Sequence, residues 1–200
     1  VFPELFASHG ATAIQLDGLS PRASAELVRQ ALGEVPQATL DAIVQRASGN
    51  AFHLEELIRA AAEGEGALPD TLLATLQSRV LALSPEARRV LRAASVFGEA
   101  CTARAVEALV DGSSLAFGIE DWLTDLAHKE LLSGAPPAAG GQRELRFRHA
   151  LVRDAVYAML TDEDRVLGHA LAGAYLEREG ERDALLLAGH FLAARDGDGA

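Results

Sequence analysis

Few side chains in this sequence have a type and spacing that could support catalysis or metal binding. His53 and Glu56 lie three positions apart, so on a helix both would project from one face and could reach a cation. The pattern HExxH is absent, however, and no second histidine is placed to complete such a site. Nothing in the sequence around Cys101, the single cysteine, marks it as a nucleophile. The sequence therefore predicts neither catalytic residues nor a metal site.

Nucleotide hydrolysis would require a lysine on the phosphates and an acid that holds magnesium. The pattern G-x-x-x-x-G-K-S/T does not occur, and the only lysine, Lys129, lies near the end of a predicted helix. There is also no strand of four hydrophobic residues that ends in paired acids. We therefore expect that this chain does not hydrolyse nucleotide by itself and holds no cofactor when isolated.

His149 is the residue whose position is most informative. It ends an alternating segment, residues 144–149, in which Leu145 and Phe147 occupy the inward positions. Because the side chains of a strand alternate between its two faces, His149 shares the face of these apolar residues. One interpretation is a buried, hydrogen-bonded histidine that closes the strand, and the other is an imidazole that contacts a ligand. The alternation alone is compatible with both.

The composition indicates what class of protein carries these residues. Of its 200 residues 49% are hydrophobic and 24% are charged, which is typical of a globular protein. No apolar run approaches the roughly 20 residues that a membrane span needs, and the first residues, VFPELFASHG, lack the features of a signal peptide. A single cysteine excludes internal disulfides. We expect a cytoplasmic chain without a membrane segment, and its start without methionine suggests a piece of a longer protein.

Residues 1–83 predict a short strand followed by four helices. The strand covers residues 11–19, ATAIQLDGL. Ser20 before Pro21 is an N-terminal helix cap with proline at the first helical position. Apolar residues at helical spacing then define four helices, the last with Leu73 and Leu76 on its inward face. These helices end at Gly33, Gly49, Gly64 and Leu83.

Residues 84–160 predict three helices and a β-hairpin. The third helix sets Ile119, Trp122, Leu123 and Leu126 on one face, so we expect Trp122 to be buried. A loop rich in proline and glycine then separates Leu132 from the alternating segment, which indicates a hairpin. Helix–helix–helix–hairpin is the order of a winged-helix domain, a variant of the helix-turn-helix.

The C-terminal part is predicted to be helical again. A helical pattern runs on from Ala150, and two further helices cover residues 163–179 and 182–195. Their pairing is similar to one hairpin of a helical repeat. The fold class that follows is mainly α, with one small β-hairpin.

The charge of the chain argues against nucleic acid as a partner. The formal net charge is −11, whereas a protein that binds DNA or RNA needs a basic surface to neutralise phosphates. The helix that would enter the major groove carries four acidic residues and Lys129 as its only cation. Arg146 and Arg148 on the hairpin are too few to reverse this balance.

Two segments resemble a known family. Residues 48–72, SGNAFHLEELIRAAAEGEGALPDTL, are similar to the helical lid of STAND ATPases, the signal-transducing relatives of AAA+ proteins. Residues 145–160, LRFRHALVRDAVYAML, are similar to the end of that family's winged-helix domain. In bacteria such modules are often fused to LuxR-type regulators, Ser/Thr kinases or nucleotide cyclases, and act in signal transduction and transcription regulation.

The resemblance implies site residues and cofactors. The family's lid carries a Gly-x-Pro motif near the adenine, which matches Gly49, Asn50 and Ala51, with alanine in place of proline. The family's winged-helix histidine contacts the β-phosphate of ADP in the closed state, and the matching position is His149. ATP or ADP with Mg²⁺ would then be bound in the parent protein, by a P-loop core of the same polypeptide.

The resemblance also implies a division of the chain. Residues 1–19 would end the nucleotide-binding core, 20–83 would form the lid, 84–160 the winged-helix domain and 161–200 the start of a helical repeat region. The lid and winged helix would close over the nucleotide and couple its state to a signalling output, and the C-terminal helices would bind a protein partner. The alternative is a helical protein-interaction module that works without nucleotide.

Overall fold

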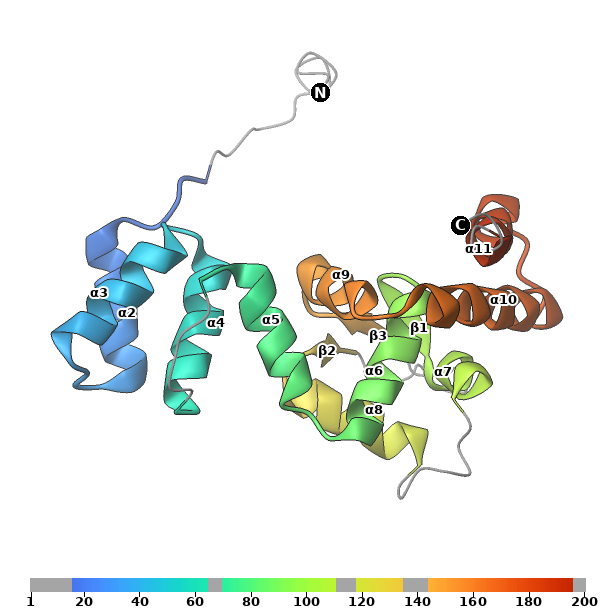
Figure 1. Ribbon diagram of the computed structural model, residues 1–200, viewed down its shortest axis with the longest axis horizontal. Coiled ribbons are helices and arrows are strands. Elements are labelled where there is room, and N and C mark those ends of the chain that lie inside the picture. The colour runs from blue at the N-terminus through green and yellow to red at the C-terminus, as the bar shows by residue number, and fades with distance from the viewer. Residues whose placement is uncertain (1–15, 65–69, 111–117, 135–143, 196–200) are drawn as a thin grey trace, which may run out of the picture. The chain divides into compact units, whose positions relative to one another are not determined.

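The computed structural model describes residues 16–64, 70–110, 118–134 and 144–195 (Figure 1). Within these residues it has ten helices and three short strands, which confirms the mainly α fold with a small β-hairpin. The chain divides into two compact units, Val1–Leu72 and Leu73–Ala200. Each unit has its own buried side chains.

The first unit contains three helices, α2 (Pro21–Leu32), α3 (Gln37–Ala47) and α4 (Ala51–Ala62). Helix α2 begins where the sequence predicts, because the Ser20 hydroxyl accepts a hydrogen bond from the backbone N–H of Ala23. All three helices contribute apolar side chains to one core. Its buried members are Val28, Leu40, Ile43, Ala47, Leu54 and Leu57.

The predicted strand over residues 11–19 is not found in its described part. Residues 16–19 are irregular, and residues 11–15 lie outside the described residues. The backbone N–H of Leu19 donates a hydrogen bond to the Gly49 carbonyl over 2.8 Å. This single bond ties the segment to a turn between helices, whereas a strand needs a partner strand with a repeated ladder of bonds.

Helix α5 (Leu72–Leu81) leads into the second unit. Leu76 and Val80 are buried as expected, whereas Leu73 is 50% exposed and so does not lie on the inward face. The Arg79 guanidinium donates a hydrogen bond to the carbonyl of Lys129, which connects α5 to the end of a later helix.

The second unit continues with alternating helices and short strands. In chain order these are α6 (Pro85–Val96), β1 (Ala100–Thr102), α7 (Ala103–Leu109), α8 (Ile119–His128), β2 (Leu132–Ser133) and β3 (Glu144–Phe147). The strands form one antiparallel sheet in the order β1-β3-β2. Leu132 faces Phe147 across the predicted hairpin, and Cys101 faces Leu145 on the other side of β3.

The alternation of β3 sets which of its side chains enter the core. Leu145 is fully buried and Phe147 is 8% exposed, whereas Glu144 and Arg146 between them are exposed. Trp122 on α8 is half-buried, so the expectation that it is buried is wrong. The buried stripe of α8 follows the spacing i, i+4 and i+7, and Trp122 lies at its edge. That stripe consists of Ile119, Leu123 and Leu126.

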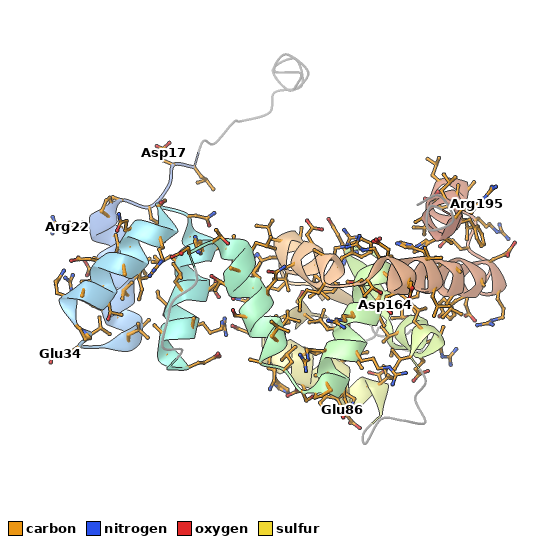
Figure 2. All side chains as sticks on the ribbon, in the orientation of Figure 1. Asp17, Arg22, Glu34, Glu86, Asp164 and Arg195 are labelled. Carbon is orange, nitrogen blue, oxygen red and sulfur yellow. The ribbon has the colours of Figure 1, made fainter. Side chains whose placement is uncertain are left out.

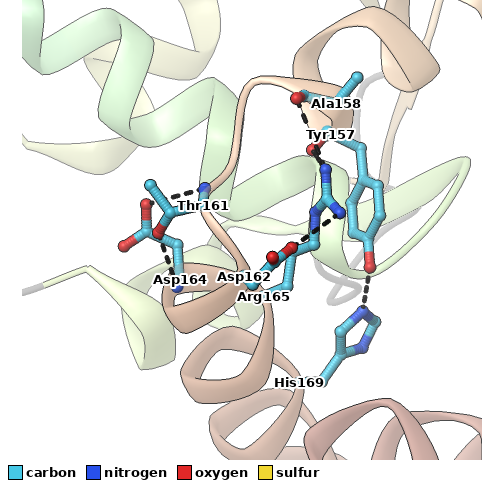
Figure 3. Close-up of polar contacts among 7 residues, drawn as sticks. All are labelled: Tyr157, Ala158, Thr161, Asp162, Asp164, Arg165 and His169. Atoms are coloured by element: carbon cyan, nitrogen blue, oxygen red, sulfur yellow. Dashed lines mark hydrogen bonds and ion pairs between the residues drawn. The ribbon is translucent and has the colours of Figure 1, made fainter. Parts of the chain in front are cut away.

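Three further helices complete the second unit: α9 (Ala150–Ala158), α10 (Asp162–Arg178) and α11 (Ala184–Arg195). The last two lie within two residues of the helices that the sequence predicts. Helix α10 begins with a capping box, in which the Thr161 hydroxyl and the Asp164 carboxylate each accept a backbone N–H of the other residue (Figure 3). Helices α10 and α11 pack closely against each other, with the Phe191 ring over Gly173.

Candidate functional site

Gly49 lies at a point where two backbone segments approach closely. Its φ of +79° is in the left-handed region that favours glycine. A Cβ atom at this position would lie 2.9 Å from the Leu19 carbonyl oxygen. A Cβ atom on Gly18 would likewise lie 3.2 Å from the Gly49 carbonyl oxygen. The turn between α3 and α4 therefore needs glycine at position 49 for its own geometry.

Asn50, the neighbouring predicted site residue, is the N-terminal cap of α4. Its side-chain oxygen accepts a hydrogen bond from the backbone N–H of His53 over 3.0 Å. Its own backbone N–H donates to the carbonyl of Ala47 over 2.8 Å. The side chain is exposed beyond this contact. Asn50 thus begins α4, and its side-chain amide remains accessible from solvent.

A cavity of about 630 Å³ lies beside Gly49, between α2 and α3. Leu19, Leu40 and Val44 give it apolar walls, and Arg29 and Asp41 bring one charge of each sign to it. Ser24 also lines the cavity, and it is 1% exposed with no hydrogen-bond partner for its hydroxyl among the described residues. The volume lies within the range of small-molecule sites.

His149 lies at the junction of β3 and α9. Strand β3 ends at Phe147, and His149 has extended φ and ψ angles of −137° and 139° as the N-terminal cap residue of α9. Its carbonyl accepts the backbone N–H of Val152 over 3.0 Å, while its side chain makes no cap hydrogen bond. The side chain is half-buried rather than fully inward, because the strand alternation stops two residues earlier. Its imidazole is therefore partly open to solvent.

The structure brings Gly49 and Asn50 together at one turn, in the first unit. His149 belongs to the second unit. Each of the three positions is at the beginning of a helix or directly before it.

A cluster of polar rings that the sequence does not predict lies among α9, α10 and α11. The Tyr157 hydroxyl is 2.8 Å from Nε2 of His169, and Nδ1 of His169 is 2.9 Å from Nδ1 of His190 (Figure 3 shows the first of these contacts). Both histidines are buried. Because only one of two facing Nδ1 atoms can carry the hydrogen of this bond, both imidazoles cannot be charged while it persists.

Burial and charge together keep the two histidines neutral. Burial lowers the pKa of His169 below its ordinary value, and the charges of His190 and Arg153 lower this pKa further. Burial also lowers the pKa of His190. The guanidiniums of Arg153 and Arg165 lie 4.8 and 5.2 Å from the centre of the Tyr157 ring, where cation–π attraction holds them. Protons therefore reach this cluster only at lower pH than an exposed histidine.

The remaining candidates for chemistry are buried side chains. His53 is 7% exposed, and its pKa is lowered by burial. Burial and the nearby charge of Glu144 raise the pKa of the Cys101 thiol to about 12, so at neutral pH it stays protonated. Among the residues that the structure describes, no three His, Cys, Asp or Glu side chains gather in a way that could hold a metal. No helix in the same residues is long and apolar enough to cross a membrane.

The histidine pair left only a weak signal in the sequence. His169 and His190 each interrupt an otherwise small or apolar stretch of a predicted helix, GHALAG and AGHFLA. A polar residue in such a stretch needs a buried partner, but nothing in the sequence says that the two are partners of each other.

Comparison with protein-family models and with curated protein sequences found no match to this chain. The functional interpretation therefore depends on the residues and the geometry described above.

Proposed function

We propose that this chain is the regulatory part of a STAND-type ATPase. In this proposal residues 20–83 form the lid, 84–160 a winged-helix domain and 161–200 the first helices of a repeat region. Together they close over ATP or ADP with Mg²⁺, which a P-loop core of the same cytoplasmic, bacterial polypeptide holds. Closure and opening would couple the state of the nucleotide to a signalling output.

The observation that carries the proposal is the order of elements in α6 to β3. This part of the chain has three helices, the short strand β1 and a terminal β-hairpin of β2 and β3. In the sheet, β3 lies between β1 and β2. A helix-turn-helix with a hairpin appended to its last helix is the arrangement of a winged helix. Helix α9 follows the β-hairpin and leads into the helical hairpin of α10 and α11. This is the order that the family resemblance implies.

The position of His149 supports a contact with nucleotide. An imidazole at the start of a helix, partly open to solvent, can donate a hydrogen bond to a phosphate oxygen and respond to its loss. Its preceding residue is held in place, since Arg148 forms an ion pair of 2.8 Å with Glu130. The cavity beside Gly49 supports the lid assignment in the same way, because it offers a ligand-sized space at the family's adenine-proximal motif.

The electrostatics of the second unit argue against DNA as the ligand of this winged helix. Glu120 and Asp121 are exposed on the first turn of α8, the helix that would enter a major groove. Arg146, one of the two hairpin cations, is paired with Glu144 over 2.6 Å. A surface of this kind would be repelled by phosphates.

A second candidate function is a protein-interaction module that works without nucleotide. It is favoured by helix α11, in which Leu185 is 85% exposed and Leu192 is 60% exposed. These leucines lie two turns apart on one side of the helix. Exposed apolar residues grouped in this way are typical of contact surfaces.

The test uses the parent polypeptide with its P-loop core. A hydrogen bond to a charged phosphate contributes about 1.5–3 kcal/mol, so its removal from the closed state speeds ADP release by roughly 10- to 150-fold. We expect this from His149→Ala, measured as release of fluorescent ADP, together with a higher basal output. His128→Ala, a histidine on the exposed end of α8, is the matched control and should leave ADP release unchanged.

Two outcomes would contradict the proposal. If His149→Ala leaves ADP release unchanged but lowers the melting temperature of residues 1–200, His149 is a packing residue. If the parent protein binds no nucleotide and its compactness is the same with ADP and ATP, the interaction-module alternative replaces the STAND proposal.

A further inference from the structure

A groove of about 500 Å³ lies among α6, α7 and α10 of the second unit. It is open to solvent. Its floor is apolar and is formed by Val96 of α6, Leu109 and Val110 at the end of α7, and Leu160 before α10. Contact between such an apolar surface and water is unfavourable, so covering the surface lowers the free energy.

One edge of the groove is positively charged. Arg88, Arg89 and Arg92 of α6 line it, and Arg88 and Arg92 lie one helical turn apart on the same side of the helix. Within the described parts of the chain no carboxylate pairs with Arg88 or Arg92, and the buried Nε of Arg92 has no hydrogen-bond partner. In a chain with a net charge of −11, this gathering of guanidiniums is a local exception.

One acidic residue also lines the groove. Asp164, which also lines the groove at the start of α10 (Figure 2), accepts the backbone N–H of Thr161 in the capping box. Its charge is also favourable at the helix N-terminus, where it interacts with the helix dipole. Asp164 keeps its charge, so the lining of the groove sets three guanidiniums against one carboxylate.

Helix α10 contributes exposed leucines to the lining of the groove. Leu167 is 60% exposed and Leu171 is 39% exposed, and they lie one turn apart on α10. They add exposed apolar surface to that of the floor. An amphipathic helix with apolar residues at one-turn spacing would cover both the floor and these two leucines.

We propose that this groove binds an acidic amphipathic helix of a partner protein. Apolar side chains of that helix, spaced by one turn, fill the floor and cover Leu167 and Leu171. Carboxylates on its flank, also one turn apart, form charge-assisted and in part bidentate hydrogen bonds with Arg88 and Arg92. The inference does not depend on nucleotide binding, because the residues that carry it line this groove and are not the proposed nucleotide contacts Gly49, Asn50 and His149.

The experiment selects peptides from a displayed library of helical sequences of about 16 residues, a length that spans four turns. Residues 1–200 serve as bait, and the double variant Arg88→Glu/Arg92→Glu serves for counter-selection. We expect enriched peptides to share leucine or phenylalanine at one-turn spacing, with Asp or Glu on one flank. Fluorescence anisotropy of the most enriched peptide then gives its affinity for each variant.

The expected affinity changes separate charge from apolar contact. Arg88→Gln/Arg92→Gln should weaken binding by about tenfold or more, because two charge-assisted hydrogen bonds are lost, and added salt should weaken binding to the wild type. Leu167→Ser should weaken binding without unfolding, since this side chain is already exposed. Arg104→Glu on α7, an exposed arginine outside the groove, is the matched control and should bind as the wild type does.

Three results would overturn the proposal. The first is a selection in which no peptide is enriched over the counter-selection. The second is an enriched peptide without acidic residues, or one that binds the glutamine variant as tightly as the wild type. The third is saturation of the groove by anilinonaphthalene sulfonate, a small anion with an apolar body, when no peptide binds there. This last result would show that the occupant is a small ligand.

Discussion

Tyr157, His169 and His190 show how a few buried polar atoms tie three helices together. Each contact joins atoms on different helices, α9 to α10 and α10 to α11, with distances of 2.8 and 2.9 Å. Both histidines are buried and have lowered pKa values, so the folded protein holds them neutral. The arrangement makes the association of these helices sensitive to protons.

We expect the free energy of unfolding to fall as the pH drops below 6.5. In the unfolded chain these histidines take up protons near their ordinary pKa of 6.5, whereas in the folded chain their lowered pKa values delay this uptake. The unfolded state therefore binds more protons in that window, and stability is lost with falling pH. Urea unfolding at a series of pH values between about 5 and 8, the range in which histidines titrate, measures the effect.

His190→Asn is the control for this pH dependence, because its amide can replace Nδ1 in the hydrogen bond but does not titrate. For this variant we expect the free energy of unfolding to depend less steeply on pH. The dependence that remains comes from His53 and His169. An equally steep loss in the variant would show that His190 is not among the responsible groups.

At position 49 a side chain is excluded by the backbone itself. We expect Gly49→Ala to destabilise the chain by about 2–3 kcal/mol, since it combines a strained φ with a contact to a carbonyl oxygen. Gly180 after α10 is the control, because its φ of +82° is similar but a Cβ atom there would meet nothing within 4 Å. Gly180→Ala should therefore cost only about 1 kcal/mol, from backbone conformation alone. Equal costs in chemical denaturation would show that the approach of Leu19 to Gly49 does not contribute.

At the scale of elements, the hairpin of α10 and α11 depends on a close approach at one small residue. A Cβ atom on Gly173 of α10 would lie 2.9 Å from the Phe191 ring of α11. A Cβ atom on Gly189 of α11 would meet nothing within 4 Å. Packing against Phe191 thus requires a small residue at position 173, whereas there is room for a side chain at position 189.

The different surroundings of these glycines predict opposite results. Gly189→Ala should stabilise the protein by about 0.5–1 kcal/mol, because alanine is the better helix former. Gly173→Ala should not, since the same gain is offset by displacement of the Phe191 ring. In a Phe191→Ala background, Gly173→Ala should become stabilising, and a double-mutant cycle of thermal unfolding measures this coupling. A coupling near zero would mean that the ring moves aside freely.

At the scale of the whole molecule, the two compact units carry different parts of the proposed function. The cavity beside Gly49 is in the first unit, whereas His149, the histidine pair and the arginine-edged groove are in the second. In the proposal, a P-loop core of the same polypeptide holds the nucleotide, since no phosphate-binding loop occurs in this sequence.

We expect purified residues 1–200 to hydrolyse no ATP above the buffer rate and to bind nucleotide weakly at most. Phosphoryl transfer needs a lysine and a metal-holding acid around the phosphates, and this chain has no motif that supplies them. A phosphate-release assay with Mg²⁺ measures the rate. Metal-dependent turnover that copurifies with the chain through successive columns would refute the assignment.

Much of the helical fold could be predicted from the sequence, because the signals that begin and end a helix are local. The side chain of Ser20 accepts the backbone N–H of Ala23, as expected of a cap. The apolar spacing also gave the buried stripe of α8 except for Trp122, whose half-buried position at the stripe edge depends on its neighbours. Helix caps and apolar periodicity involve residues within a few positions of each other. Helices can therefore be predicted from them without the tertiary structure.

Only the tertiary structure decided which distant residues meet. Strand β1 is three residues long and has no alternating pattern of its own, and it exists because β3 pairs with it from more than 40 positions away. His169 and His190 are partners because α10 and α11 fold back on each other. Arginines of α6 and leucines of α10 line one groove because these two helices contact each other. Such contacts depend on the packing of whole elements, which no local pattern in the sequence specifies.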